Sequence, residues 1–471
     1  NGHPLNTFSR NIMTLIEGEV FFEDENPDPT VPCGPLDWKP ERDVPPAPAR
    51  GLHRLYAIVG GTVHPISGPA IEDGTVVIRN DRIASIGRDV EVPPGAGIID
   101  AAGLHVYPGL IDGGGNLGLT EISMVRSTRD NFDIADFAPE LHTASAINPH
   151  SEHIRIARTV GITSQLTKPT GGYISGQSAV IDLDGWTADE MLVKERVALH
   201  MSIPILPARL TGDDKKDKIK EHKETMREIE DFLDMAKKYA TAKKAAVSDP
   251  TIAPDMDLRL EAMVPYVRGE KPVIFSASSY KAILDSIDFA EKHGLTPIIS
   301  GGAQAWKLAD TLKEKDIPVI LGTVFSYPQG RFEAWDSVYA CASVLDRAGV
   351  TWCFASESAA HAYNLGIQAG MAIAHGLAPD RAMYALTLGA AKLLGIDEDL
   401  GSLEEGKIAN VIVTTHPPTQ TVSRVTNMFI RGRPIELTSL HTENYVKFRD
   451  RPEPVLPPEK ELVGPPSFTG K

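Results

Sequence analysis

The chain has 471 residues, a formal net charge of −16, 42% hydrophobic residues and 23% charged residues. Its length predicts one large domain and a smaller one, and its composition is ordinary for a globular protein. The acidic balance argues against nucleic acid and membranes as partners, because anionic partners are bound through lysine and arginine patches. Cys33, Cys341 and Cys353 are widely spaced, which argues against a disulfide framework or a cysteine zinc site.

No apolar run reaches the roughly 18 residues that a transmembrane helix needs. The sequence begins at Asn1 without a signal-like apolar stretch. An exported protein whose leader has been removed would begin in this way, and so would a partial chain. We expect a periplasmic or secreted protein, with a cytoplasmic one as the alternative.

Both ends of the chain are predicted to be extended arms. Residues 1–53 are rich in proline between Pro27 and Pro48, which interrupts regular hydrogen-bonded ladders. Apolar residues between Ile12 and Phe22 leave open whether this arm is solvated or wraps over the body or a neighbour. Residues 441–471 have a similar composition and are predicted to form a second arm.

Two patches of short β-strands lie next to the arms. The first comprises 56–59, 61–63, 75–78 and 82–86, and the second comprises 410–414 and 425–430. Neither patch is large enough to bury a core by itself. We therefore predict that residues 54–104 and 400–440 form one small composite β-sandwich built from both chain ends.

Between these patches, apolar strand-like runs alternate with helical patterns, as is typical of a parallel α/β barrel. Residues 105–399 are predicted to form a TIM-type (β/α)8 barrel, which places the chain in the α/β class. Strands are expected at about 105–112, 162–167, 178–183, 199–206, 272–277, 296–300, 317–322 and 351–356. Helices are expected at 150–160, 280–293, 304–315, 333–348, 365–376 and 380–394.

A helical insertion at about 209–270 interrupts this alternation. Residues 213–246 form a highly charged helical pattern whose apolar seam has heptad-like spacing. A surface helix packed on the barrel explains this seam. A lid or a subunit contact inserted after the fourth strand is the alternative.

Three stretches resemble the metal-dependent amidohydrolase superfamily. Residues 108–116, Pro-Gly-Leu-Ile-Asp-Gly-Gly-Gly-Asn, are similar to its first barrel strand, P-G-L-I-D-x-H-x-H. Residues 401–410 look like its closing G-S-L-E-x-G-K-x-A-D, and residues 382–395 like its A-L-x-x-x-T-x-x-P-A-x-x-L-G helix. The resemblance covers roughly residues 54–437 and is nearest to the imidazolonepropionase-like and dihydroorotase-like branch. It implies hydrolysis of carbon–nitrogen bonds other than peptide bonds, with a catalytic metal in typical members.

The resemblance also implies where metal ligands should stand, and the chain departs from the family at those positions. Gly114 and Asn116 replace the two histidines of the first strand, and strands five and six offer Ser276 and Ala303. Strand eight carries Glu357 where the family has an aspartate. Catalytic zinc takes three or more protein donors. We therefore predict a divergent member that lacks the usual metal ligands, with no metal or other cofactor.

Other residues at the predicted barrel mouth remain candidates. Glu357 is the candidate catalytic residue, as a cation ligand or general base, although a carboxylate with a structural partner is an equal interpretation. The glycine-rich loop from Lys168 to Ser178 could hold an anion or carboxylate through exposed N–H groups with Lys168 nearby, or could be a tight structural turn. The candidate pocket residues are Asn116, Lys168, Ser276, Gln304 and His361.

Three functions are compatible with this pattern, so whether the chain is an enzyme stays open. The favoured one is a non-catalytic amidohydrolase-like subunit that holds a partner in a homo- or hetero-oligomer. The partner would be a catalytically complete homologue or another copy. The second is an active hydrolase of cyclic amides that binds a divalent metal such as zinc around Glu357 and His361. The third is a protein that binds a small polar molecule at the barrel mouth without reaction.

Overall fold

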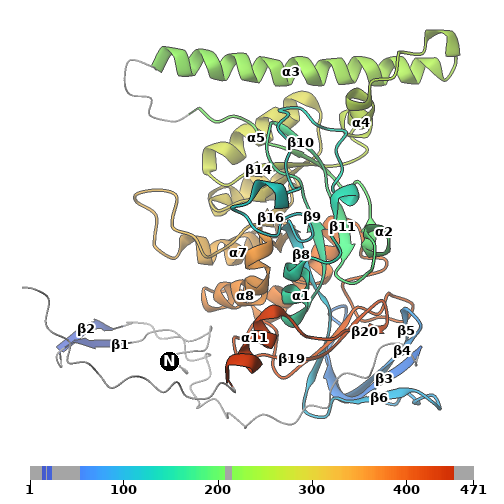
Figure 1. Ribbon diagram of the computed structural model, residues 1–471. Helices are drawn as coiled ribbons and strands as arrows, with labels where there is room; N and C mark the ends of the chain where they lie inside the picture. The colour runs from blue at the N-terminus through green and yellow to red at the C-terminus, as the bar shows by residue number, and fades with distance from the viewer. Residues whose placement is uncertain (1–12, 17–18, 24–53, 207–214, 450–471) are drawn as a thin grey trace, which may run out of the picture.

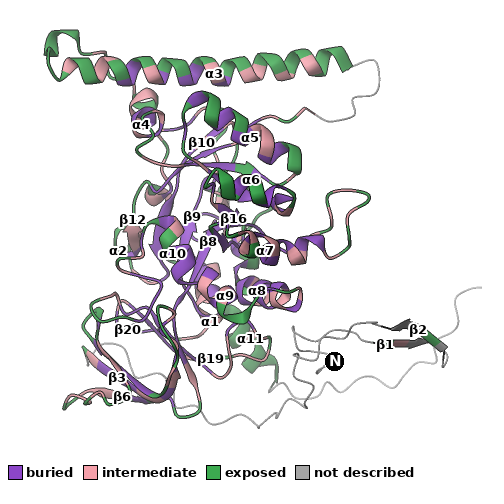
Figure 2. Ribbon diagram, turned by 180° about the vertical axis from the view of Figure 1, so that it is seen from behind, coloured by how far each residue is buried: buried purple, intermediate pink, exposed green. Residues whose placement is uncertain are grey.

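The computed structural model describes residues 13–16, 19–23, 54–206 and 215–449. A β-sheet lies at one end of the molecule, an α/β body in the middle, and the long helix α3 (Lys215–Ala246) at the other end (Figure 1). Buried residues are concentrated in the body and in the sheet (Figure 2). No helix in the described ranges is both long and apolar enough to cross a bilayer. The predicted periplasmic or secreted location stays a prediction.

Short strands form the centre of the body, and their ladders define two sheets. The six-stranded sheet contains, in spatial order, β10 (Ile174–Gln177), β13 (Leu199–Met201), β14 (Val273–Ala277), β15 (Pro297–Gly301), β16 (Val319–Leu321) and β17 (Trp352–Phe354). The four-stranded sheet contains, in spatial order, β12 (Leu192–Lys194), β11 (Ala179–Asp182), β9 (Ile162–Thr167) and β8 (Leu110–Gly115). From β13 to β17 every ladder is parallel, and β8 also pairs with β9 in parallel.

The body departs from a regular parallel barrel at its third predicted strand. The strand predicted at 178–183 is present as β11, but it pairs with β9 antiparallel. Only residues 168–178 connect the two strands, and they contain no helix. A parallel connection needs a crossover of a dozen or more residues, usually with a helix. In the described ranges no ladder joins β8 to β17, so full closure of an eight-stranded barrel stays a prediction.

Helices alternate with these strands much as the sequence predicts. The predicted helix 280–293 coincides with α5, which begins after the capping hydroxyl of Ser279 and ends at Gly294, whose φ is +69°. The predicted helix 380–394 is divided at Leu386 and Thr387 into α9 and α10. The helices of the body are α1 (Glu152–Thr159), α2 (Ala188–Met191), α4 (Leu258–Val267), α5 (Tyr280–His293), α6 (Ala309–Glu314), α7 (Ser337–Ala348), α8 (Leu365–Ala374), α9 (Pro379–Ala385) and α10 (Leu388–Leu394). Short 3-10 turns are η1 (Arg126–Thr128), η2 (Thr143–Ala146), η3 (Pro250–Ile252), η4 (Ala305–Leu308) and η5 (Ala359–Asn364).

The buried carboxylate of Asp112 connects β8 to the chain that follows β17. Its oxygens accept hydrogen bonds from the Ser356 N–H at 2.9 Å and from the Ser356 hydroxyl at 2.5 Å. Gln165 on β9 donates from Nε2 at 2.5 Å, and the Gly114 N–H donates at 3.2 Å. Burial raises the pKa of Asp112, and these donors lower it. The four hydrogen bonds offset part of the cost of burying the carboxylate and join β8, β9 and the segment after β17 around it.

Strands from both ends of the chain pair within one eight-stranded sheet. Its spatial order is β20-β19-β18-β7-β3-β4-β5, with β6 paired to β3. The antiparallel ladder between β18 and β7 joins the C-terminal strands to the N-terminal ones. A two-layered composite sandwich stays a prediction. The strands are β3 (Leu55–Val63), β4 (Ile71–Arg79), β5 (Arg82–Gly87), β6 (Gly97–Asp100), β7 (His105–Pro108), β18 (Val411–Thr414), β19 (Val425–Ile430) and β20 (Arg433–Pro434).

The described parts of the two predicted arms contain regular structure. In the N-terminal arm, β1 (Met13–Ile16) pairs antiparallel with β2 (Glu19–Glu23), so the expectation that this segment forms no ladder is wrong. The cluster of prolines begins only at Pro27, after this hairpin. The predicted C-terminal arm begins with α11 (Leu440–Arg449), and Glu443 on α11 pairs with Arg155 on α1. The remainder of both arms lies outside the described residues.

Helix α3 uses its apolar seam over only half of its length. Ile229, Phe232, Leu233 and Ala236 are buried, whereas no residue from 215 to 228 is. Farther along, Tyr239 packs with Val264 of α4. Packing as a surface helix therefore accounts for the second half. The predicted insertion begins near 209, and residues 207–214 lie outside the described ranges. A lid or subunit contact made by the first half stays a prediction.

Replacing Ser356 with alanine tests the role of the Asp112 carboxylate. The substitution removes a hydroxyl donor to a buried acidic group, which is expected to lower the free energy of unfolding by about 1.5–3 kcal/mol in a urea titration. The matched control is Ser276→Ala on β14, where the side chain is exposed. This control should change the free energy by no more than about 0.5 kcal/mol. Equal effects of the two substitutions would contradict the role given to Asp112.

Candidate functional site

The site lies at the carboxyl end of β8, where Gly114 faces the side chain of Lys168. A Cβ placed on Gly114 would be 3.6 Å from Cδ of Lys168 and 3.7 Å from its Nζ. The backbone N–H of Lys168 also donates to the carbonyl of Gly115 at 2.9 Å, which fixes the start of the lysine beside β8. A side chain at position 114 would therefore begin at van der Waals distance from the lysine stem.

The neighbouring positions of β8 have no room for side chains. A Cβ on Gly113 would lie 2.5 Å from Sγ of Cys353, and one on Gly115 would collide with Gln165. Asn116 keeps its side chain, but both polar atoms are used: Oδ1 accepts from the Ala359 N–H at 2.5 Å, and Nδ2 donates to Thr120 at 3.0 Å. Asn116 thus positions the loop after β17.

Lys168 is a buried cation with one hydrogen-bond partner. It is only 8% exposed, and its Nζ donates to Oγ of Ser300 on β15 at 3.2 Å. Within the described ranges no carboxylate oxygen lies within 4.0 Å of this Nζ. An ammonium group carries three donors. Two of its N–H groups are therefore left for a further acceptor.

His200 on β13 is a second buried polar group beside Lys168. It is 2% exposed, and its Nε2 has no hydrogen-bond partner among the described residues. Burial, followed by the positive charge of Lys168, lowers the pKa of His200 to about 3. His200 is therefore neutral at physiological pH, and Lys168 provides the positive charge of this pair.

Glu357 lies in the segment after β17, and its backbone pairs with Gly114. Its backbone has a φ of +60°, in the left-handed region, and its N–H donates to the carbonyl of Gly114 at 2.8 Å. The carboxylate is close to Gly322, where an added Cβ would lie 2.6 Å from Cδ of Glu357. Glu357 is exposed, and so is His361, which lies in η5. The described residues contain no group of three or more histidine, cysteine, aspartate or glutamate side chains placed to hold a metal ion.

The other predicted site residues divide between the mouth and its wall. Ser276 is exposed on β14, in register with Ser300 on β15. Ala303 is 9% exposed and offers no polar side chain. Gln304 is engaged on both sides, because its Oε1 accepts from the Tyr280 N–H at 2.5 Å and its Nε2 donates to Glu333. Ser276 therefore remains available at the mouth, whereas Gln304 is structural.

Several N–H groups of the glycine-rich loop are engaged within the fold. The N–H groups of Tyr173 and Ile174 both donate to the carbonyl of Asp136, and that of Gln177 donates to the carbonyl of Leu141. This arrangement favours the interpretation of the loop as a structural turn. From this loop, the side chain of Lys168 is the group that reaches the site.

His150 and His153 do not act together. Nε2 of His153 is 2.8 Å from the carbonyl oxygen of Glu121, and His150 is exposed at a separate cavity.

The thiols are also unsuited to act as nucleophiles, because burial raises the pKa of Cys341 to about 12 and that of Cys353 further.

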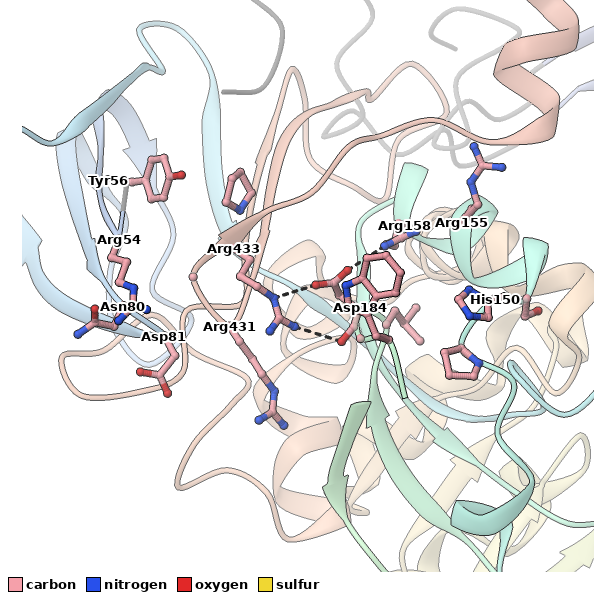
Figure 3. A pocket seen from close by; sticks show the side chains of 17 residues that line it. Arg54, Tyr56, Asn80, Asp81, His150, Arg155, Arg158, Asp184, Arg431 and Arg433 are labelled. Atoms are coloured by element: carbon pink, nitrogen blue, oxygen red, sulfur yellow. Dashed lines mark hydrogen bonds and ion pairs between the residues drawn. The ribbon is translucent and has the colours of Figure 1, made fainter. Parts of the chain in front are cut away.

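A cavity of about 690 Å³ lies between part of the sheet and the body (Figure 3), and none of the predicted mouth residues lines it. Ion pairs lie at or next to its wall. Nε of Arg431 is 2.6 Å from the buried carboxylate of Asp182, while Arg433 and Arg158 contact Asp184 at 2.9 and 3.2 Å. These contacts connect the sheet to β11 and α1.

Comparisons with known proteins show similarity in sequence and in fold. Residues 267–435 match the model of the amidohydrolase family. The amidohydrolase tasK of Hapsidospora irregularis is 22% identical over 505 residues, which cover 93% of this chain and 50% of that protein. A crystal structure of an amidohydrolase from Thermotoga maritima MSB8 has a TM-score of 0.71 at 25% identity and covers 81% of this chain and 99% of that chain. Together these similarities support membership in the amidohydrolase superfamily.

The resemblance is confirmed at the level of the superfamily, which implies a fold that contains a TIM barrel. The imidazolonepropionase-like and dihydroorotase-like branch stays a prediction. A structure of molinate hydrolase, at 16% identity and a TM-score of 0.52, shares the amidohydrolase fold alone. The chain spans about half the length of the curated amidohydrolase it matches. The amidohydrolase site itself stays a prediction for Glu357, Asn116, Lys168, Ser276 and His361.

The neutral state of His200 predicts a dependence of stability on pH. The unfolded state gains a proton below about pH 6.5, but the folded state, with a pKa of about 3, does not. His200 therefore stabilises the fold above about pH 6.5, and this contribution is lost as the pH falls, by about 1.4 kcal/mol per pH unit. Between about pH 6 and 4.5, the free energy of unfolding should fall less steeply with pH in His200→Gln than in the native chain. The difference between the two slopes should be about 1.4 kcal/mol per pH unit. The exposed control His150→Gln should keep the native slope, and an unchanged slope in His200→Gln would contradict the account.

Proposed function

We propose that this amidohydrolase-superfamily chain does not perform the metal-dependent hydrolysis typical of the family and acts as a partner subunit of an oligomer. The observation that supports this proposal most directly is the contact between Gly114 and Lys168. A buried ammonium lies beside a position where the family places an imidazole. A cation at this position would repel a divalent ion instead of coordinating it.

The donors available at the mouth do not fit a catalytic divalent metal. Zinc takes three or more nitrogen, oxygen or sulfur donors at about 2.0–2.3 Å. The implied ligand positions offer no side chain at Gly114, an engaged amide at Asn116, a neutral hydroxyl at Ser276 and a methyl group at Ala303. Glu357 is the only carboxylate in this set. We therefore derive no hydrolytic step through a bound metal.

The alternative is an active hydrolase built around Glu357 and His361. The left-handed backbone of Glu357 favours it, since strained residues are concentrated at functional sites. Two exposed side chains still fall short of a closed ligand set. Hydrolysis of cyclic amides would then require ligands from outside the described residues, such as a partner subunit.

Exposed aromatic side chains near the carboxyl end of β16 support a role in assembly. The segment between β16 and α7 contains Tyr327, Phe332 and Trp335, which are 91%, 95% and 71% exposed. Large apolar groups exposed together on one segment are typical of protein interaction sites. The partner in this proposal is a second copy of the chain or a catalytically complete homologue.

Metal analysis tests the first part of the proposal. Protein purified without chelators should contain far less than one zinc, iron or manganese per chain when measured by plasma mass spectrometry, because its donors do not form a cage. Dialysis against EDTA should leave the melting temperature unchanged. Stoichiometric metal that is lost in Glu357→Gln would overturn the proposal in favour of the hydrolase.

The assembly can be tested with Tyr327→Ser, Phe332→Ser and Trp335→Ser combined in one variant. If this segment forms the interface, sedimentation velocity should show a smaller species than the native chain, because the loss of aromatic anchors weakens an interface most. Trp186→Ser, which removes an aromatic side chain that is 74% exposed elsewhere, is the matched control. A native chain that is monomeric alone and with a homologue, or equal assembly of both variants, would contradict the proposal.

A further inference from the structure

We propose that the barrel mouth is a binding site for a carboxylate ligand, held by Lys168 with Ser300 and His200. This inference goes beyond the proposed function and does not depend on it. The buried ammonium of Lys168 has one hydroxyl partner, and no carboxylate of the described residues lies within 4.0 Å of it. A buried charge without an opposite charge is costly, and a bound anion would compensate it.

The groups around Lys168 are complementary to a ligand that only accepts hydrogen bonds. The ammonium has two N–H groups without an acceptor, and the Ser300 hydroxyl, which accepts from the ammonium, can donate its own hydrogen onward. His200 contributes a buried Nε2 without a partner in the described ranges, and it can donate from this atom as the neutral Nε2–H tautomer. A carboxylate has two oxygens and no donor, which matches these three groups.

The charge of the site favours a monoanion over a phosphate. Lys168 provides one positive charge and His200 is neutral. A ligand with one negative charge neutralises the lysine. A phosphate dianion would leave an excess negative charge in a buried site, which is costly.

Exposed serines lie next to this group. Ser276 and Ser278 are exposed at the end of β14, and Ser276 is in register with Ser300 on the adjacent strand. The polar end of the ligand would thus contact Lys168, while the remainder would lie along the exposed serines. The carbonyl of Ser278 accepts a hydrogen bond from the Gln304 N–H at 2.9 Å, which holds this segment in place.

Saturation-transfer NMR on the acetate methyl group tests the proposal, with acetamide as the neutral probe of the same shape. The native protein should saturate acetate, and acetamide should not displace it. Lys168→Met keeps the aliphatic stem and removes the charge, so acetate binding should weaken by about 30-fold or more. Lys281→Met, at an exposed lysine on α5, should bind acetate as the native chain does. Absence of acetate binding by the native protein, or equal binding by Lys168→Met, would overturn the proposal.

Two further measurements keep the test decisive. Ser300→Ala should weaken acetate binding by about 2- to 12-fold, which provides a second answer if Lys168→Met does not fold. In chloride buffer, Lys168→Met should melt at the same temperature as the native chain or higher, because removing an uncompensated buried charge is neutral or stabilising. If Lys168→Met melts at a much lower temperature and Ser300→Ala binds acetate as the native chain does, Lys168 is a structural lysine and the proposal is overturned. Metal content is measured separately, so failure of the proposed function and failure of this inference are distinguishable.

Discussion

The side chain of Lys168 lies beside Gly114 at the carboxyl end of β8. Because position 114 has no side chain, the stem of Lys168 can lie against β8 and carry its ammonium into the body. The positive charge then influences its surroundings, since it helps to keep His200 neutral. A group that attracts anions and repels divalent cations thus lies beside the first barrel strand. Both the proposed loss of metal chemistry and the proposed carboxylate site follow from this arrangement.

Buried hydrogen bonds and ion pairs hold the fold around Lys168 together. Asp112 connects β8, β9 and the segment after β17 through four hydrogen bonds to one buried carboxylate. Ion pairs such as Arg431 with Asp182 connect the sheet to the body. None of these groups needs a metal to satisfy its hydrogen bonds. The fold can therefore persist when the residues at the mouth change, as expected when function is carried by sites placed on a common fold.

Much of the fold could be predicted from the sequence, because it depends on local patterns. Helix α5 is bounded by a serine cap and a glycine with positive φ, and β9 is a continuous buried run between turns. The antiparallel direction of β11 was not predicted. Apolar periodicity specifies a strand but not its direction, and the short connection at 168–178 was the available signal.

The site was less predictable, because its geometry depends on contacts distant in sequence. The motif points to Glu357 and Gly114, and the glycine-rich loop points to Lys168, whose side chain lies beside Ser300 in the structure. His200 and Ser300 were not assigned roles. Each is a polar residue within an apolar strand, which signals an inward-facing group, but only the fold brings both next to Lys168.

Crystals soaked with zinc provide the most direct test of the central claim, that the mouth has exchanged a metal site for a buried ammonium. An anomalous difference map recorded at the zinc edge should show no peak within coordination distance of both β8 and Glu357, and density for Lys168 should remain against Gly114. A zinc peak coordinated by Glu357 and His361, with the lysine displaced from β8, would contradict the account.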